Sequence, residues 1–255
     1  MPLPYTCSVF GSLVISGAVM AAGGYVYAGM SPQSQFFGPT LIAGSDRDEF
    51  ALTYDDGPND ACTERLLEIL AQHDARATFF VIGRFARERA SLVRQIHAAG
   101  HVVGNHTWSH PFLMTRSPRR VREELGATNA ELEDILGERI RYFRPPHGAR
   151  RPDVLRVARE MGLIPVLWNA MGYDWRPISS TQILANLDRG IGRNRRRGVG
   201  SNLLLHDGGQ TGIGQDRSQT VVATTELLRA WSGRVRFVTV EHWGDEQNYV
   251  RASQD

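Results

Sequence analysis

Carboxylate, imidazole and guanidinium side chains gather in a few short motifs of this sequence, and each motif follows a run of apolar residues. Asp55 and Asp56 are adjacent in the motif TYDDGP, while His106 and His110 lie in the motif HTWSH. Two neighbouring carboxylates at a strand end are costly unless a cation or a proton offsets their charge. Two histidines and one carboxylate can bind a divalent metal and leave one coordination position open, as in catalytic zinc sites. The alternative for the acidic pair is an Asp-rich turn that caps the next helix.

Further polar residues could complete a hydrolytic site around such a metal. The i, i+4 spacing of His106 and His110 would place both rings on one face of a helical turn. Water in the open position would become a nucleophile, and the carboxylate that does not bind the metal could act as its general base. His206 could be the matching acid, and Asp174 is a candidate partner that fixes its tautomer and raises its pKa.

Seven short apolar runs after residue 46 predict buried β-strands, because they carry aromatic or β-branched residues. Amphipathic stretches between them predict helices, among them 63–73, 117–136, 152–161 and 219–231. This alternation favours a parallel sheet with helices outside, and seven units in one stretch suit a single barrel better than two domains. The predicted strands are Phe50–Tyr54, Ala77–Val81, His101–Asn105, Arg141–Arg144, Ile164–Trp168, Asn202–Leu205 and Arg236–Val240.

Carboxylate, imidazole and guanidinium side chains follow the ends of five predicted strands. The site of a parallel α/β barrel is built at the carboxyl ends of its strands, so we expect these side chains to meet there. In chain order they are Asp55 and Asp56, His106 and His110, Arg144 and His147, Asp174, and His206 with Asp207.

Together these motifs resemble those of the polysaccharide deacetylase family, also called carbohydrate esterase family 4. The resemblance covers about residues 48–242, and its five motifs stand in the family's order: TYDDGP at 53–58, HTWSH at 106–110, RPPHG at 144–148, DW at 174–175 and LLLHD at 203–207. One such motif is weak support, whereas five in order are specific. The resemblance implies an α/β fold, a distorted (β/α)7-type barrel, preceded here by an N-terminal hydrophobic segment.

The resemblance also implies a role for each motif residue. Asp55 would be the catalytic base, held in place by Arg144, and His206 would be the general acid, tuned by Asp174. The cofactor would be a divalent metal ion, usually Zn²⁺, although two histidines and a carboxylate also accept Co²⁺ or Ni²⁺. Its ligands would be Asp56, His106 and His110. The substrate-binding residues would be His147, whose backbone N–H would face the oxyanion, and Trp175 and Leu204 around the acetyl methyl group.

Three positions depart from the family's pattern. Tyr54 stands where phenylalanine is usual beside the aspartates, which is a mild exchange. His147 stands where tyrosine or phenylalanine is more common, and a ring that faces the cleft would add a titrating group. Met171 replaces an acidic residue that is often found upstream of Asp174. The departures concern the rim of the site and leave its central residues intact.

The implied activity is the removal of acetyl groups from N-acetylated sugars of a cell-wall or chitin-like polysaccharide. One alternative keeps the site and changes the substrate, as in an O-acetyl esterase on xylan or a deformylase of a lipid-linked sugar. Another is a non-catalytic carbohydrate-binding protein, which is expected to lack a ligand or the base. Here the base, the acid and all three ligands are present.

Composition excludes several other classes of protein. The chain has 255 residues, 42% hydrophobic and 22% charged, which is ordinary for a globular protein. Its net charge of +2 does not indicate nucleic-acid binding, and the absence of lysine excludes Schiff-base and P-loop lysine chemistry. Two cysteines, Cys7 and Cys62, cannot form a Cys-rich zinc site, and Cys62 is expected to be a small buried residue.

The N-terminal part of the chain differs from the rest, because no charged residue precedes Asp46. Residues 8–30 are apolar or small and are numerous enough to span a bilayer. A membrane anchor is favoured, ahead of a cleaved signal peptide and of a Gly-rich arm packed on the domain. We therefore expect a cell-envelope protein, membrane-anchored or exported. The predicted parts are a hydrophobic segment 1–30, a linker 31–46, a catalytic domain 47–243 and a tail 244–255.

Other conspicuous residues are expected to be structural or solvated. The histidines without a partner at ligand spacing are expected at the surface or at helix ends: His73, His97, His101 and His242. The Arg-rich run 193–197 is expected to be a solvated loop, and Arg150 is expected to be solvated, although it lies close to the RPPHG motif. Trp168 is expected to pack in the core.

Overall fold

The fold is organised around β1 (Glu49–Gly57), an interior strand of a parallel sheet that pairs with three other strands. The strand order is β5-β4-β3-β2-β1-β7-β6, and β8 pairs with the start of β1. The other strands are β2 (Ala77–Val81), β3 (Val102–Asn105), β4 (Tyr142–Phe143), β5 (Ile164–Pro165), β6 (Ala170–Met171), β7 (Ser201–His206) and β8 (Arg236–Phe237). This computed structural model describes residues 23–244. Predictions for 1–22 and 245–255, including Cys7 and most of the hydrophobic segment and tail, lie outside the described residues.

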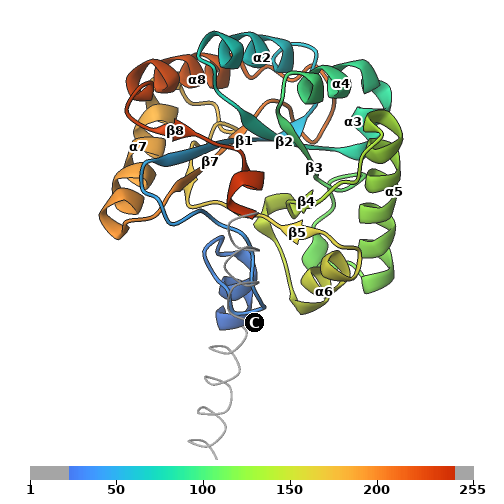
Figure 1. The fold of residues 1–255 in the computed structure, drawn as a ribbon. Helices are drawn as coiled ribbons and strands as arrows, with labels where there is room; N and C mark the ends of the chain where they lie inside the picture. Colours follow the sequence, from blue (N-terminus) through green and yellow to red (C-terminus); the bar gives the residue numbers. More distant parts are fainter. Residues whose placement is uncertain (1–22, 245–255) are drawn as a thin grey trace, which may run out of the picture.

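The sheet curls into an incomplete barrel with helices on its outside (Figure 1). β5 and β6 stand at opposite ends of the strand order, yet only residues 166–169 connect them. Because so few residues can span at most about 17 Å, the two ends of the sheet must approach each other. The predicted distorted (β/α)7-type barrel is thereby confirmed. All nine residues of β1 are buried, as expected for a strand covered on both faces.

The two longest helices, α5 and α7, begin at side-chain caps and end at glycines with positive φ. The Ser117 side chain accepts a hydrogen bond from the Arg120 N–H at the start of α5, and Gly137 ends this helix with a φ of 71°. The helices of the domain are α2 (Thr63–Gln72), α3 (Gly83–Glu88), α4 (Ala90–Ala98), α5 (Pro118–Leu136), α6 (Pro152–Glu160), α7 (Ser180–Arg197) and α8 (Ser218–Trp231).

The prediction that residues 193–197 form a loop is wrong, because they are the last turn of α7. A capping box formed by Ser179 and Gln182 starts this helix, and its buried stripe continues through Leu187 and Ile191 to Asn194. Three arginines in the final turn also interact favourably with the negative end of the helix dipole. Residues 193–197 therefore continue α7 to Arg197 and do not form a separate loop.

His101 is buried, with 3% of its surface exposed, so only the helix-end alternative of its prediction holds: its N–H donates to the Ile96 carbonyl oxygen at the end of α4. Its Nδ1 accepts a hydrogen bond from the Ala77 N–H at 3.2 Å, and its ring lies against Phe79. Burial, with a smaller effect of Arg76, lowers the pKa of His101 to about 4, so the ring is a neutral acceptor. Trp168 and Cys62 are buried, and both predictions are confirmed.

Residues 31–42, predicted as part of a linker, are packed onto the domain. Leu41 is 2% exposed and forms a parallel bridge with Val166. Its N–H donates to the Pro165 carbonyl oxygen at 2.8 Å. Residues 23–30 form a short helix in front of this segment. Within residues 23–244, no helix combines the length and the hydropathy that crossing a bilayer requires.

Candidate active site

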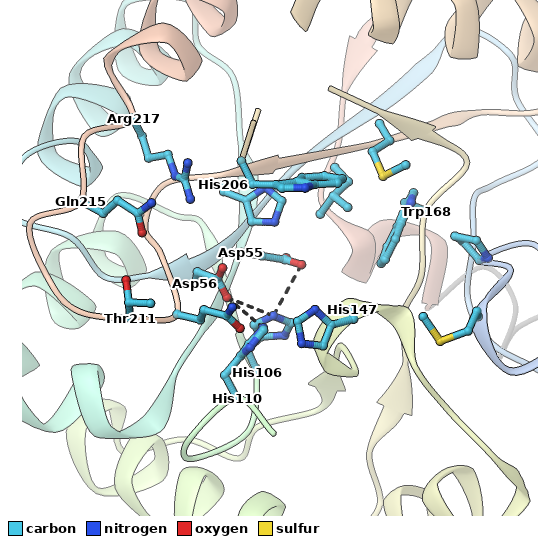
Figure 2. A pocket seen from close by; sticks show the side chains of 16 residues that line it. Asp55, Asp56, His106, His110, His147, Trp168, His206, Thr211, Gln215 and Arg217 are labelled. Atoms are coloured by element: carbon cyan, nitrogen blue, oxygen red, sulfur yellow. Dashed lines mark ion pairs between the residues drawn. The ribbon is translucent and has the colours of Figure 1, made fainter. Parts of the chain in front are cut away.

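Asp56, His106 and His110 converge at the carboxyl ends of β1 and β3 (Figure 2). One donor atom of each lies within 4.8 Å of the other two, and all three residues are buried. The Nε2 atoms of His110 and His106 lie 3.1 and 3.5 Å from Oδ1 of Asp56. That buried oxygen has no hydrogen-bond partner among residues 23–244. Two imidazoles and a carboxylate with an unpartnered oxygen fit a divalent cation, in agreement with the predicted ligand set.

A strained loop, and not the predicted helical turn, brings the two imidazoles together. Thr107 and His110 have φ values of 68° and 59°, and Asp56 has a φ of 71°. Residues other than glycine adopt this left-handed region at a cost, and such conformations cluster at functional sites. The i, i+4 spacing therefore indicated two imidazoles that do converge, but for the wrong geometric reason.

Hydrogen bonds behind the loop fix the orientation of the ligands. Nδ1 of His106 lies 2.8 Å from the Arg144 carbonyl oxygen, which accepts its proton and leaves the Nε2 lone pair directed at Asp56. Burial and the neighbouring His106 lower the pKa of His110 to about 3, so its ring is in the neutral, ligating form at pH 7. Burial would raise the pKa of Asp56, but the histidines beside it outweigh burial and hold that pKa well below its usual range.

Glu124 on α5 is a buried carboxylate that anchors the histidine loop. Its side-chain oxygens accept hydrogen bonds from the N–H and hydroxyl of Ser109, both at 2.8 Å. Arg120 provides its counter-charge at 2.6 Å. Glu124 is 1% exposed, and sequence reasoning missed it because its partner lies 15 residues away on another element.

Replacing Glu124 with alanine is therefore expected to weaken metal binding about 10- to 100-fold, the usual cost of losing a group that orients metal ligands. Competition against a chromophoric chelator measures the affinity. Glu123→Ala is the matched control, because Glu123 also pairs with Arg120 but is exposed and does not touch the loop. Equal affinities for the two variants would show that Ser109 needs no anchor.

Asp55 lies beside the three ligands and is held by Arg144, as the resemblance implied. Nη1 of Arg144 donates to Oδ1 of Asp55 and to the Thr53 hydroxyl, both at 2.8 Å. The other carboxylate oxygen of Asp55 lies 3.7 Å from Nε2 of His106. Arg144 is fully buried over the Phe80 ring at 4.2 Å, and burial lowers its pKa against the opposing effect of Asp55. One oxygen of Asp55 is thus tethered while the other points towards the ligand cluster.

Asp174 and His206 form a buried pair beside Asp55, because His206 ends β7 and is the register partner of Asp55 on β1. Nδ1 of His206 lies 2.8 Å from one oxygen of Asp174, and the other oxygen accepts from the His206 backbone N–H and the Thr220 hydroxyl, both at 2.7 Å. Burial disfavours the charged imidazole, but the Asp174 carboxylate outweighs it and raises the pKa of His206 to about 9. His206 therefore carries a proton on both ring nitrogens at pH 7.

A cavity of about 460 Å³ connects these groups. Eight of the ten predicted site residues line it, while Arg144 and Asp174 lie behind Asp55 and His206. The His147 ring faces the cavity, 4.7 Å from the His110 ring, and Trp175 lies 5.3 Å from the His206 ring. Met171, which the sequence analysis named as a departure from the family's pattern, also lines the cavity. Sequence reasoning did not place the remaining wall there: Met30, Pro32, Trp168, Gln210, Thr211, Gln215 and Arg217.

Comparison with known proteins places this geometry in a family. Residues 43–166 match the sequence model described as polysaccharide deacetylase. The chitooligosaccharide deacetylase of Azorhizobium caulinodans is 38% identical over 190 residues, which cover 72% of this chain and 88% of that protein. The peptidoglycan-N-acetylglucosamine deacetylase of Bacillus cereus is 36% identical over 139 residues, 54% of this chain and 50% of that protein.

A solved structure agrees with this assignment. The structure of the Bc1960 peptidoglycan N-acetylglucosamine deacetylase superposes with a TM-score of 0.72 at 28% identity. The superposition covers 80% of this chain and 91% of that one. With the sequence matches and the five motifs at the strand ends, these findings show that the chain belongs to the polysaccharide deacetylase family, carbohydrate esterase family 4.

Proposed function

We propose that this protein is a divalent-metal-dependent hydrolase that removes acetyl groups from the N-acetylglucosamine units of a chitin-like or cell-wall polysaccharide. The observation that carries the proposal is the convergence on one cavity of a metal-ligand cluster, a tethered carboxylate and an imidazole paired with a buried carboxylate. The substrate class is supported by relatives whose names specify chitooligosaccharide and peptidoglycan N-acetylglucosamine.

Asp56, His106 and His110 would hold the cation, and Zn²⁺ is our choice because a cluster of two imidazoles and one carboxylate suits it best. When bound, the cation supplies Lewis-acid chemistry that activates water and polarises the acyl carbonyl. Asp55 takes the proton of the attacking water on the oxygen that Arg144 does not hold. Arg144 orients that carboxylate, since its guanidinium is buried against it.

His206 delivers the proton that the departing nitrogen needs. Its Nδ1–H is engaged by Asp174, so the proton available to the substrate is the one on Nε2. The backbone N–H near His147 is our candidate for the oxyanion, and Trp175 and Leu204 would enclose the acetyl methyl group. Leu204 is 2% exposed and packs with Leu167 and Trp168, which supports a small apolar pocket.

Removal of the metal is expected to abolish acetate release. Treatment with a chelator followed by desalting should reduce the release of acetate from N-acetylchitotetraose to background, and equimolar Zn²⁺ should restore it. An acetylated xylan and an N-formylated sugar assayed in parallel distinguish esterase and deformylase activities. Chelator-resistant turnover, or turnover of acetylated xylan alone, would contradict the proposal.

We also propose that residues 1–30 keep the catalytic domain at a membrane in the cell envelope. Residues 1–45 carry no charged side chain, and exposed Tyr25 and Tyr27 are of the aromatic type that favours a membrane–water interface. We expect the full-length chain to sediment with membranes and to be released by detergent but not by 1 M salt. Release by salt alone would indicate a peripheral contact with the membrane. A soluble protein whose mature chain begins after residue 21 would indicate a cleaved signal peptide.

A further inference from the structure

Residues 28–34 precede the part of the chain that matches the family model, which begins at residue 43. They nevertheless lie against the catalytic cavity, because Met30 and Pro32 form part of its wall. From this position, and resting on the proposed function, we infer that the N-terminal segment completes a sugar-binding subsite of this enzyme. Arg150 is the positioning residue that clamps the segment in place.

The clamp consists of a buried guanidinium and backbone carbonyl oxygens. Nη2 of Arg150 donates to the carbonyl oxygens of Ser31 and Ser34, at 2.8 and 2.6 Å. Nη1 donates to those of Gly29 and Gly148, at 3.3 and 3.0 Å. The Arg150 backbone N–H adds a bond to Gly29. Arg150 therefore ties the N-terminal segment to the RPPHG loop that carries His147, and the prediction that it is solvated is wrong.

Because the Arg150 side chain is buried, the arginine and the N-terminal segment depend on each other. Arg150 is 1% exposed, and within residues 23–244 no carboxylate pairs with it, so carbonyl oxygens alone compensate its charge. Burial lowers the pKa of Arg150 to about 10, and the group still carries its charge at pH 7. A buried charge is tolerated only when its donors are satisfied. Three of the four side-chain acceptors belong to the segment, so the segment cannot detach without exposing the guanidinium.

The N-terminal segment lies so close to the domain at residue 29 that only glycine fits there. A Cβ atom at Gly29 would lie 2.7 Å from the Arg150 carbonyl oxygen and 2.9 Å from the Met114 side chain. A Cβ atom at Gly24, in the same short helix, would have no atom within 4 Å among residues 23–244. The two glycines therefore form a matched pair, since both gain the same side chain but only one of them blocks docking.

The cavity wall formed by the N-terminal segment continues beyond the place of the acetyl group. A second cavity of about 340 Å³ shares Pro32, Trp168 and Met171 with the catalytic one and is also lined by Gln33. Arg189 and Arg193 of α7 border its far side. A substrate of several sugar units that places one acetyl group beside Asp55 can continue along Pro32 into this space. The segment thus contacts the neighbouring sugar, and its loss should weaken binding more than it slows chemistry.

Kinetics on N-acetylchitotetraose test this subsite. Met30→Ala and Gly29→Val are expected to raise KM about fivefold with kcat within about twofold, the signature of lost uniform binding, whereas Gly24→Val should behave as the unmodified chain. Zinc content should stay equal in all four proteins. Unchanged KM in Met30→Ala and Gly29→Val would overturn the inference. Absence of acetate release from the unmodified protein would instead refute the proposed function.

Amide hydrogen exchange tests the clamp without any substrate. Arg150→Met keeps a flexible unbranched stem but removes the guanidinium and its donors, so amides in residues 28–34 are expected to exchange at least about tenfold faster than in the unmodified chain. Peptides from β1 should exchange equally in both, which controls for global unfolding. Equal exchange in residues 28–34 would show that Arg150 does not hold the segment, whatever the enzyme's substrate.

Discussion

Replacing Asp55 with asparagine is expected to lower kcat for acetate release about 10²- to 10⁴-fold, the range for a lost general base. Asparagine keeps an oxygen that can accept the hydrogen bond of Arg144, which now contacts Oδ1 of Asp55 at 2.8 Å. It has no basic oxygen to take a proton from water. The three metal ligands are untouched, so the metal content should remain near that of the unmodified enzyme.

Asp60→Asn is the control for the Asp55 variant. Asp60 lies five residues further along the chain in an exposed pair with Arg89, outside the cavity. The Asp60→Asn variant should therefore retain full activity. Measured kcat together with metal content separates the loss of a base from the loss of the cation. Normal turnover by Asp55→Asn would remove Asp55 from the mechanism.

The central site could be predicted because its residue types are rare at strand ends and costly there without a function. Asp55 and Asp56 lie in the last three residues of β1, and the structure pairs Asp55 with His206 of β7 in register. Parallel strands bring such ends together whatever the loops do. The longer strands could also be predicted from the sequence: β2 has the predicted bounds, Ala77–Val81. β6, with two residues, is too short to produce a periodic pattern.

The walls of the cavity could not be predicted, because their residues are of ordinary types and come from distant parts of the chain. Met30 and Gln210 meet in one cavity although 180 positions separate them. Neither residue is chemically distinctive, and nothing in the sequence links them. The network behind Arg144 was missed for a similar reason. Asn202 accepts from the Thr53 hydroxyl at 3.1 Å, and an asparagine inside an apolar strand does not reveal its partner.

Arg150 and His101 show why burial of a single polar residue escapes sequence reasoning. Each is compensated by backbone groups, the carbonyl oxygens around Arg150 and the Ala77 N–H beside His101. Backbone donors and acceptors occur at every residue, so the sequence contains no sign of them. Asp174 and Arg144 differ, because their partners are ionisable side chains within recognisable motifs.

Replacing Asp174 with asparagine is expected to move the alkaline limb of the kcat/KM profile to lower pH by more than about one unit, since one pH unit corresponds to about 1.4 kcal/mol of lost charge interaction. In the unmodified enzyme the His206 imidazolium loses its proton near pH 9, or somewhat lower once a cation offsets the charges of Asp55 and Asp56. Activity that needs this proton is present below that pH and declines above it.

The sign of the shift follows from the two opposing influences on His206. Burial lowers the pKa of His206, and the Asp174 carboxylate raises it. The neutral amide of Asp174→Asn removes the nearest negative charge, so the lowering effect of burial prevails and the pKa falls. Thr220→Val is the control, because it removes a hydrogen bond to Asp174 but keeps the carboxylate. That variant should hold its alkaline limb near the original pH, whereas Asp174→Asn should be a poor catalyst at pH 8 and recover part of its activity at pH 6. Identical limbs in the two variants would mean that another group, and not His206, supplies the proton to the leaving nitrogen.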